Sequence, residues 1–191
     1  SIEAKEHKVF LLFGVTGSGK TEVYFRSIEA CLNKGKQALV LLPEINLTEQ
    51  MLGRYEEAFP GNVVRWHSQV SPGEKRKAWD QINSKERNIL IGPRSAVFTN
   101  FSELGLIVID EEHDTSYVQQ SMPAYSGKQV ALLRGELENA VVVLGSATPS
   151  VESMHQVEAG TYHLLTLEDK YYGQENPEVE ILDMSDELRA G

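Results

Sequence analysis

The sequence predicts a doubly wound α/β domain, in which a mainly parallel sheet carries helices on both faces. Five short apolar runs are continuous rather than alternating, which suits strands buried on both faces of a parallel sheet. Segments with helical spacing separate these runs, and such alternation of strand and helix is typical of an α/β domain. Binding sites in this class of sheet lie beyond the carboxyl ends of the strands.

The predicted elements follow one another along the chain. The strands are predicted at residues 9–13, 38–42, 88–91, 106–109 and 140–144. The helices are predicted at roughly 20–34, 47–58, 72–84, 127–138 and 150–159. We assign residues 1–160 to this main domain. Residues 161–191 predict two further strands, at 162–167 and 179–184, with an exposed polar loop between them.

Composition and cysteine usage are those of a globular protein without a membrane segment. The chain has 191 residues, of which 41% are hydrophobic, an ordinary share for a globular protein. No apolar run approaches the ~20 residues that cross a bilayer, and the first residues lack the apolar core of a secretory signal. A cytoplasmic location is therefore expected. Cys31 is the single cysteine, which excludes an internal disulfide and a Cys-based zinc site, and we expect a buried thiol.

The net charge of −10 argues at first against a nucleic-acid partner. Residues 151–191, however, hold ten Asp and Glu and two Lys and Arg, which leaves 18 acidic and 16 basic residues in the first 150. Most of the acidity therefore belongs to the last segment, and the main domain is close to neutral. Bulk charge does not decide the partner.

A phosphate-binding loop follows the first predicted strand and opens a helical segment. This is the context that the motif Gly-x-x-x-x-Gly-Lys-Thr requires. The glycines turn backbone N–H groups towards phosphates, and the helix N-terminus favours negative charge. Lys20 is predicted to reach the β- and γ-phosphates, and the Thr21 hydroxyl to ligate Mg²⁺. The predicted nucleotide-binding residues are Gly14, Val15, Thr16, Gly17, Ser18, Gly19, Lys20 and Thr21.

An acidic cluster, Asp-Glu-Glu-His, follows the strand predicted at 106–109. Acids at the end of a buried strand are costly unless they meet a cation or a donor. Asp110 is predicted to hold Mg²⁺, directly or through water, and Glu111 to be the base that orients the attacking water. The second acid favours an ATP hydrolase, because a small-molecule kinase transfers to a substrate hydroxyl and often lacks such a pair.

A Ser-Ala-Thr turn follows the strand predicted at 140–144. The hydroxyls of Ser146 and Thr148 are expected to hydrogen-bond His113 and to sense what occupies the nucleotide site. Taken alone, Ser-Ala-Thr is also a common turn or helix cap, and Ser150 is a candidate cap for the next helix. The coupling function therefore depends on the other two motifs.

These three motifs, in this order and on successive strands, resemble those of the superfamily 2 helicases, which are motors that move along nucleic acid using ATP. The resemblance narrows to the bacterial primosomal DNA helicases of replication restart. It is carried by the stretches GVTGSGKTEVY, LLPEINLT, IGPRSAVF, VIDEEHDTSY followed by QQ, and LGSATPSVES. It extends over nearly the whole chain.

The resemblance implies a RecA-like P-loop NTPase domain, the first of two motor domains of a 3′→5′ DNA helicase acting at stalled forks. ATP and Mg²⁺ are the implied cofactors. Forked or single-stranded DNA, the primosome and replication-restart proteins are the implied partners. Such a protein carries a DNA-binding region before this domain. A second motor domain with arginine fingers follows this domain, and the protein also carries zinc sites. Residues 161–191 would lead towards the second motor domain as an acidic linker. Nothing demands an oligomer, and we expect a monomer.

The resemblance also implies functions for individual residues. Lys20, Asp110, Glu111 and His113 are the implied catalytic residues, and Ser146 and Thr148 join His113 in coupling hydrolysis to movement. The implied DNA-facing residues are Pro43, Glu44, Thr48, Arg94, Ser95, Tyr117 and Tyr125. They would contact phosphates, or stack on bases in the case of the two tyrosines.

Local structure offers alternatives for some of these residues. Pro43 can simply end a strand, Thr48 can cap the helix that starts near Glu49, and the tyrosines can pack their own loop. The loop at 115–128 also departs from the family, which usually has Arg-Asp where this chain has Lys128-Gln129.

Other functions stay open at the level of sequence. One is another superfamily 2 motor, such as an RNA helicase or a restriction-enzyme translocase. Two come from different classes, a phosphate-loop kinase and a nucleotide-gated binding module. Hydrolysis in two-lobed motors uses charges supplied across the interface between the lobes. We therefore expect this chain alone to bind Mg-nucleotide, to hydrolyse it very slowly and to unwind nothing.

Overall fold

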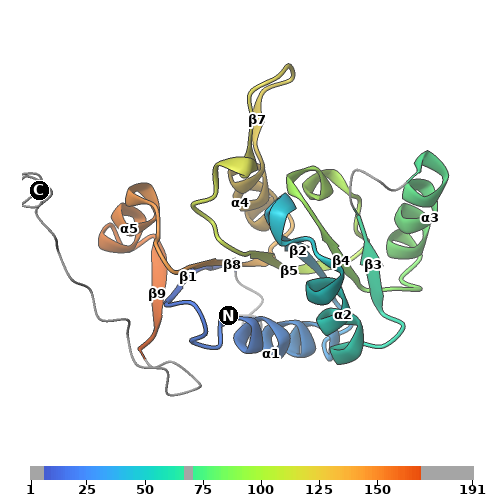
Figure 1. Ribbon diagram of the computed structural model, residues 1–191, viewed down its shortest axis with the longest axis horizontal. Coiled ribbons are helices and arrows are strands. Elements are labelled where there is room, and N and C mark those ends of the chain that lie inside the picture. The colour runs from blue at the N-terminus through green and yellow to red at the C-terminus, as the bar shows by residue number, and fades with distance from the viewer. Residues whose placement is uncertain (1–6, 67–70, 169–191) are drawn as a thin grey trace, which may run out of the picture.

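A parallel sheet between two layers of helices forms the body of the protein (Figure 1). The computed structural model describes residues 7–66 and 71–168. The order of strands in the sheet is β3-β4-β2-β5-β8-β1-β9, and all neighbours pair in parallel. These strands are β1 (Val9–Gly14), β2 (Gln37–Leu41), β3 (Val63–Arg65), β4 (Ile89–Gly92), β5 (Leu104–Ile109), β8 (Val141–Ser146) and β9 (Tyr162–Leu167).

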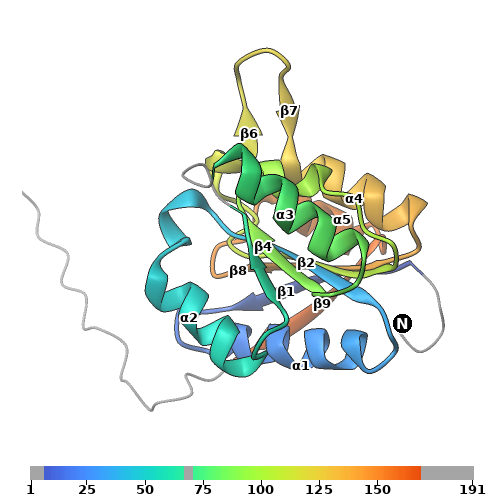
Figure 2. The same cartoon turned by 90° about the vertical axis from the view of Figure 1, so that its right-hand side faces the viewer.

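Helices cover both faces of this sheet (Figure 2). One face carries α1 (Lys20–Leu32) and α2 (Glu49–Ala58), and the other carries α3 (Pro72–Asn83), α4 (Gly127–Leu137) and α5 (Val151–Glu158). Three short 3-10 helices, η1 (Glu44–Asn46), η2 (Arg94–Phe98) and η3 (Thr115–Tyr117), follow strands or loops between these elements. The predicted fold class is confirmed, and each predicted helix and strand within the described residues forms within two residues of its expected ends.

The central strands explain why the apolar runs are continuous. Every residue of β2, β4, β5 and β8 is buried, because helices cover these strands on both sides. Two apolar clusters result, one under α1 and α2 and the other under α3, α4 and α5. A strand with two covered faces needs apolar side chains at every position.

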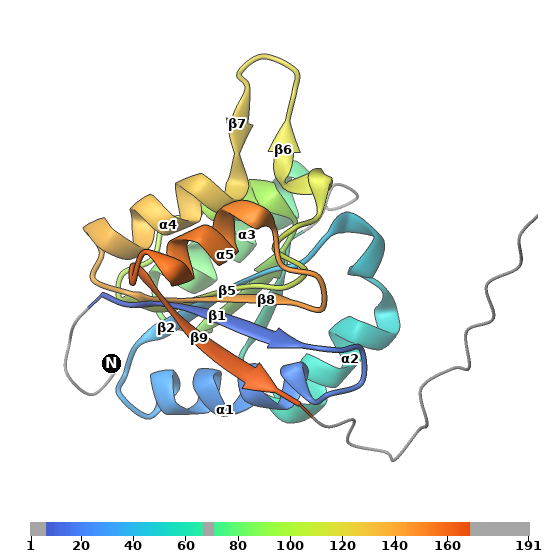
Figure 3. The ribbon, with the colours of Figure 1, turned by 90° about the vertical axis from the view of Figure 1, so that its left-hand side faces the viewer.

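The two edge strands of the sheet, β3 and β9, compare differently with the sequence prediction. The three-residue strand β3 was not predicted, because so short a run carries no usable pattern. The strand predicted at 162–167 is confirmed as β9, which pairs with β1 along its whole length at the edge of the sheet (Figure 3). The strand predicted at 179–184 lies outside the described residues.

A small antiparallel hairpin rises above the layer that contains α4 (Figures 2 and 3). Its strands, β6 (Val118–Gln119) and β7 (Tyr125–Ser126), have two residues each, which is too short to predict from sequence. The hairpin lies within residues 115–128, which the family resemblance indicates as a loop. It stands between the acidic cluster and α4, so its base is close to the carboxyl edge of the sheet.

Cys31 and Gln37 are buried polar residues of the core, and both are hydrogen-bonded. Cys31 has no exposed surface, its thiol donates to the carbonyl of Gln37, and burial raises its pKa to about 12, which confirms the buried thiol. The amide side chain of Gln37 donates to the carbonyl of Ile82 at 2.7 Å and accepts from the N–H groups of Ser102 and Glu103. In residues 7–66 and 71–168, no helix is both long and apolar enough to span a bilayer.

Replacing Gln37 with leucine tests this buried bridge. Gln37→Leu keeps the volume but leaves backbone groups of three segments without their partner, and each such buried group costs about 1–3 kcal/mol. We expect a loss of about 3 kcal/mol in the free energy of unfolding, measured by urea denaturation. Gln50→Leu, at an exposed position of α2, is the control and should change stability by less than about 0.5 kcal/mol.

Candidate active site

Three neighbouring strands bring the three sequence motifs together. The phosphate loop follows β1, the acidic cluster follows β5, and the Ser-Ala-Thr turn begins at the end of β8, which lies between β1 and β5. The register pairs Ile109 with Leu144 and Phe13 with Ser146, so the three loops start at nearly the same level of the sheet. The three motifs therefore lie next to one another at the carboxyl edge of the strands, where the sequence predicts the site.

The phosphate loop has the backbone conformation that its glycines permit. Gly17 and Gly19 have φ angles of 81° and 94°, in the left-handed region where a side chain would be strained. The side chain of Lys20 is 8% exposed, and its Nζ donates to the carbonyl of Gly14 at 2.7 Å. The ammonium group of Lys20 thus stabilises the closed conformation of the loop by donating to carbonyls at the loop's start.

These features fit a nucleotide phosphate. The hydroxyl of Ser18 is buried and has no hydrogen-bond partner among the described residues, which leaves a donor for a ligand oxygen. The N-terminal N–H groups of α1 lie next to the loop, and such groups favour an anion. The hydroxyl of Thr21 and the carboxylate of Asp110 line the same cavity and are the oxygen donors that Mg²⁺ prefers.

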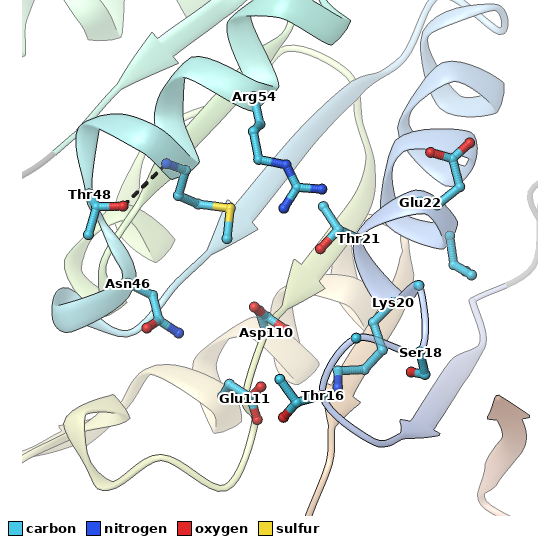
Figure 4. Close-up of a pocket in the computed structure, with 14 residues that line it drawn as sticks. Thr16, Ser18, Lys20, Thr21, Glu22, Asn46, Thr48, Arg54, Asp110 and Glu111 are labelled. Carbon is cyan, nitrogen blue, oxygen red and sulfur yellow. Dashed lines mark hydrogen bonds between the residues drawn. The ribbon is translucent and has the colours of Figure 1, made fainter. Parts of the chain in front are cut away.

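The cavity has a volume of about 950 Å³, and its walls come from three parts of the chain (Figure 4). The phosphate loop and the start of α1 form one wall, the acids after β5 the floor, and the segment from η1 to α2 the opposite wall. Its lining residues are Thr16, Gly17, Ser18, Gly19, Lys20, Thr21, Glu22, Val23, Asn46, Thr48, Met51, Arg54, Asp110 and Glu111.

The two predicted catalytic acids are held in different ways. Asp110 accepts a hydrogen bond on Oδ1 from the hydroxyl of Tyr24 at 2.8 Å. Glu111 has a φ of 46°, which is unusual for a residue with a side chain and costs about 1–3 kcal/mol. Strain of this kind persists where the surrounding structure imposes it, and it concentrates at functional sites.

His113 links the second acid to the Ser-Ala-Thr turn. Its Nδ1 lies 2.8 Å from the Ser146 hydroxyl and 3.7 Å from a carboxylate oxygen of Glu111, and its Nε2 lies 3.3 Å from the Thr148 hydroxyl. The predicted hydrogen bonds between His113 and the two hydroxyls are confirmed. His113 therefore lies beside the Glu111 carboxylate while it is hydrogen-bonded to the turn at the end of β8.

Glu112, to which the sequence assigned no function, is the buried member of the acidic cluster. Its side chain forms an ion pair with Lys128 at the start of α4 and accepts hydrogen bonds from Ser150 and Ser153 at the start of α5. Burial alone would raise the pKa of Glu112, but the Lys128 ammonium and the serine donors outweigh burial and hold the pKa below its usual value. Glu112 therefore fastens α4 and α5 to the end of β5. No local pattern in the sequence indicates this pair.

Two of the residues predicted to face DNA, Tyr117 and Pro43, are buried. Tyr117 is 2% exposed, and its hydroxyl donates to the backbone carbonyls of Leu41 and Asp110. Its ring therefore cannot stack on a base, and it packs the loop as the alternative interpretation allowed. Pro43 is also buried, where it precedes η1, so its ring does not face a strand of DNA either.

The other predicted DNA-facing residues are at least partly accessible. Glu44, Thr48 and Ser95 are exposed, and Thr48 caps α2 by accepting from the N–H of Met51. Arg94 is half-buried and donates to the carbonyl of Ser116, so it braces the base of the hairpin. Tyr125 is half-buried and packs edge-on against Phe98, with ring centroids 4.9 Å apart. Their contact with DNA stays a prediction.

Sequence reasoning missed two residues beside the cavity. Tyr24 lies one helical turn after Thr21, and this spacing on one helix face was the available signal. Arg54 reaches from α2 towards Thr21 (Figure 4), and it has no hydrogen bond or ion pair within the described residues. No sequence pattern distinguishes Arg54 from an ordinary surface arginine.

A sequence profile of the family described as DEAD/DEAH box helicase matches residues 2–157. The chain belongs to the DEAD/DEAH box helicase family. It is therefore a helicase motor domain, and this family implies the use of ATP and Mg²⁺. The observed sheet and helices agree with the RecA-like architecture expected of such a domain.

Known relatives extend this helicase assignment. The protein named Replication restart protein PriA of Bacillus subtilis (strain 168) is 50% identical over 191 residues, which cover 100% of this chain and 24% of that protein. The protein of the same name from Rickettsia conorii is 45% identical over 183 residues, 96% of this chain and 28% of that protein. The helicase domain of Pyrococcus furiosus Hef has a similar fold, with a TM-score of 0.62 and 22% identity over 87% of this chain and 36% of that one. The chain thus spans about a quarter of the length of these PriA relatives.

The pKa of Glu112 leads to a prediction about acid stability. Because its pKa in the folded state is lowered, the ionised group stabilises the fold fully above the unfolded value of about 4.3. That stabilisation is lost as the pH falls through the folded value. Glu112→Gln should therefore lower stability at pH 7, by about 3–5 kcal/mol for a broken buried pair, and lose less stability than the wild type on acidification.

Urea denaturation of both chains between pH 7 and pH 3 measures this effect. Glu136→Gln, at an exposed position of α4, is the control and should follow the wild-type curve at all pH values. A constant difference between Glu112→Gln and the wild type across this range would contradict the assignment.

Proposed function

We propose that this chain is the ATP-binding motor domain of a DNA helicase that unwinds DNA with 3′→5′ polarity at stalled forks for replication restart. The observation that carries the proposal is the meeting of the phosphate loop, the paired acids and the His113 contacts on three adjacent strands. Identity of 50% to a PriA protein over the full chain supports replication restart in particular.

In this proposal each residue of the cavity has a defined task. The loop N–H groups, the Ser18 hydroxyl and Lys20 hold the phosphates of ATP, and Thr21 and Asp110 hold Mg²⁺. When bound, ATP would supply the phosphoryl group that is transferred to water, and Mg²⁺ would neutralise charge on its phosphate oxygens. Glu111 orients that water and takes its proton, which its place on the cavity floor permits.

His113 would transmit the state of Glu111 to the Ser-Ala-Thr turn. Its contacts to Ser146 and Thr148 span the gap between the ends of β5 and β8. Because His113 is bonded to Ser146 and lies 3.7 Å from the Glu111 carboxylate, a shift of that carboxylate on hydrolysis would change the hydrogen bonds at the end of β8. We propose that this change couples hydrolysis to movement.

DNA would pass over the carboxyl edge near η1, η2 and the hairpin. Thr48 and Ser95 are exposed there and offer hydroxyls for the phosphate backbone, whereas the exposed Glu44 would contact it through its main chain only. Arg94 adds a positive charge, and Tyr125, with the exposed Phe98 beside it, offers an aromatic surface for a base. Forked or single-stranded DNA, the primosome and replication-restart proteins are the proposed partners of the longer protein.

The activity of the longer protein would require a second motor domain. The residues after β9 would lead towards it, and it would supply arginines across the interface between the lobes. We propose that the 191-residue chain is monomeric, binds Mg-nucleotide, hydrolyses it very slowly and unwinds nothing. The alternative, another superfamily 2 translocase, would use the same cavity. The two proposals are distinguished by whether DNA or RNA stimulates the ATPase of the longer protein.

Nucleotide binding by the chain itself is the first measurement. A titration with fluorescent ADP should give Mg²⁺-dependent binding that Lys20→Ala weakens at least about tenfold, because the mutation removes a charge-assisted bond worth about 1.5–3 kcal/mol. Lys77→Ala, at an exposed position of α3, is the matched control and should bind as the wild type does. Equal binding by Lys20→Ala and the wild type would refute the assignment of the loop.

Turnover is tested in the longer protein. Its ATPase should be stimulated by DNA more than by RNA, and Glu111→Gln should abolish turnover while ATP binding is retained, since the amide cannot accept the proton from water. Bound ATP and released phosphate are measured for the wild type and for Glu111→Gln, each with and without DNA, so that binding is distinguished from turnover. Normal turnover by Glu111→Gln would require another base, and stimulation by RNA alone would favour an RNA motor.

A further inference from the structure

Tyr24 connects the helix of the phosphate loop to the predicted Mg²⁺ acid. It lies on α1, is 1% exposed, and donates from its hydroxyl to Oδ1 of Asp110 at 2.8 Å. Thr21, the other predicted Mg²⁺ ligand, lies one turn earlier on the same helix, and residues at this spacing share a helix face. One turn of α1 therefore carries both a metal ligand and the donor that contacts the second ligand.

The neighbouring strand leaves space for this hydroxyl. A Cβ atom on Gly145 of β8 would lie 1.6 Å from Oη of Tyr24 and 2.7 Å from its Cζ, so any side chain at this position would displace the ring. Gly145 does not need its glycine for backbone reasons, because its φ is not in the left-handed region. The close approach of the Tyr24 hydroxyl is thus the physical reason for a glycine here.

The backbone of Asp110 is fixed independently of Tyr24. Its carbonyl accepts from the hydroxyl of Tyr117 at 2.7 Å, and its N–H donates to the carbonyl of Leu41 at 3.0 Å. The side-chain torsions of Asp110 remain free, and the last of them, which rotates the carboxylate, is intrinsically broad. The bond from Tyr24 to Oδ1 removes this freedom.

We infer that Tyr24 is a positioning residue for Asp110, which fixes the carboxylate so that its second oxygen faces the cavity and Mg²⁺. This inference rests on the proposed nucleotide function of the cavity. Tyr24 itself does not line the cavity, whereas Asp110 does, so the tyrosine acts through the acid. Donors that orient a metal-binding carboxylate in this way typically contribute 10–100-fold to metal affinity.

The test compares nucleotide binding with and without the metal. Fluorescent ADP is bound to the 191-residue chain at increasing Mg²⁺ concentration, and separately in the presence of a chelator. Tyr24→Phe, which removes the hydroxyl and keeps the ring, should raise the Mg²⁺ midpoint at least about tenfold. Binding of ADP without Mg²⁺ should stay as in the wild type, because the phosphate loop is unchanged.

Tyr117→Phe is the matched control. It removes a hydroxyl from an equally buried tyrosine that also bonds to Asp110, but through the backbone carbonyl rather than the carboxylate. It should lower the melting temperature and shift the Mg²⁺ midpoint much less than Tyr24→Phe does, because the N–H of Asp110 keeps its bond to the Leu41 carbonyl and the carboxylate keeps its bond to Tyr24. A double mutant of Tyr24→Phe with Asp110→Asn should have the midpoint of Asp110→Asn alone, because the tyrosine acts only through the acid.

Gly145→Ala is a second route to the same effect if Tyr24→Phe does not fold, since the added methyl displaces the hydroxyl without removing it. An unchanged Mg²⁺ midpoint in Tyr24→Phe would overturn the inference. So would an equal loss of binding with and without Mg²⁺, which would make Tyr24 a purely structural residue. Failure of the proposed function would look different, because Lys20→Ala would then bind ADP as well as the wild type.

Discussion

The parallel alignment of β5, β8 and β1 is the constraint on which the site depends. Strands that run in one direction end at one edge, so the loops that follow them meet. The register sets the phosphate loop, the acids and the Ser-Ala-Thr turn at nearly the same height, and β8 between the other two lets His113 reach across to Ser146. The covered core that surrounds these strands makes the edge rigid enough to hold side chains at hydrogen-bond distances.

Each member of the acidic cluster has a different structural environment, although the residues are consecutive in sequence. Asp110 and Glu111 face the cavity, the first bonded to Tyr24 and the second in a strained conformation. Glu112 points into the protein and pairs with Lys128, and His113 turns towards β8. The chain turns after β5, and the side chains of these four adjacent residues contact α1, the cavity, α4 with α5, and β8.

The buried ion pair of Glu112 also relates the hairpin to the nucleotide site. Lys128 is two residues beyond the end of β7, and Ser150 caps α5 just after the Ser-Ala-Thr turn. Both meet at Glu112, next to Glu111 in the chain. The base of the hairpin, the start of α5 and the catalytic turn are therefore parts of one bonded cluster, in which a displacement of one part strains the others.

The sequence by itself determined the fold class, the order of elements, the phosphate loop and the paired acids, because continuous apolar runs and Gly-Lys-Thr spacing are local signals. It also indicated the contact between His113 and the Ser-Ala-Thr turn, because hydroxyl residues follow a strand predicted to lie in the same sheet. The tertiary structure alone decided that Tyr117 is buried, that Tyr24 and Arg54 lie beside the cavity, and that Glu112 pairs with Lys128. These features depend on which residues far apart in sequence become neighbours, and no local pattern of residue types encodes such proximity.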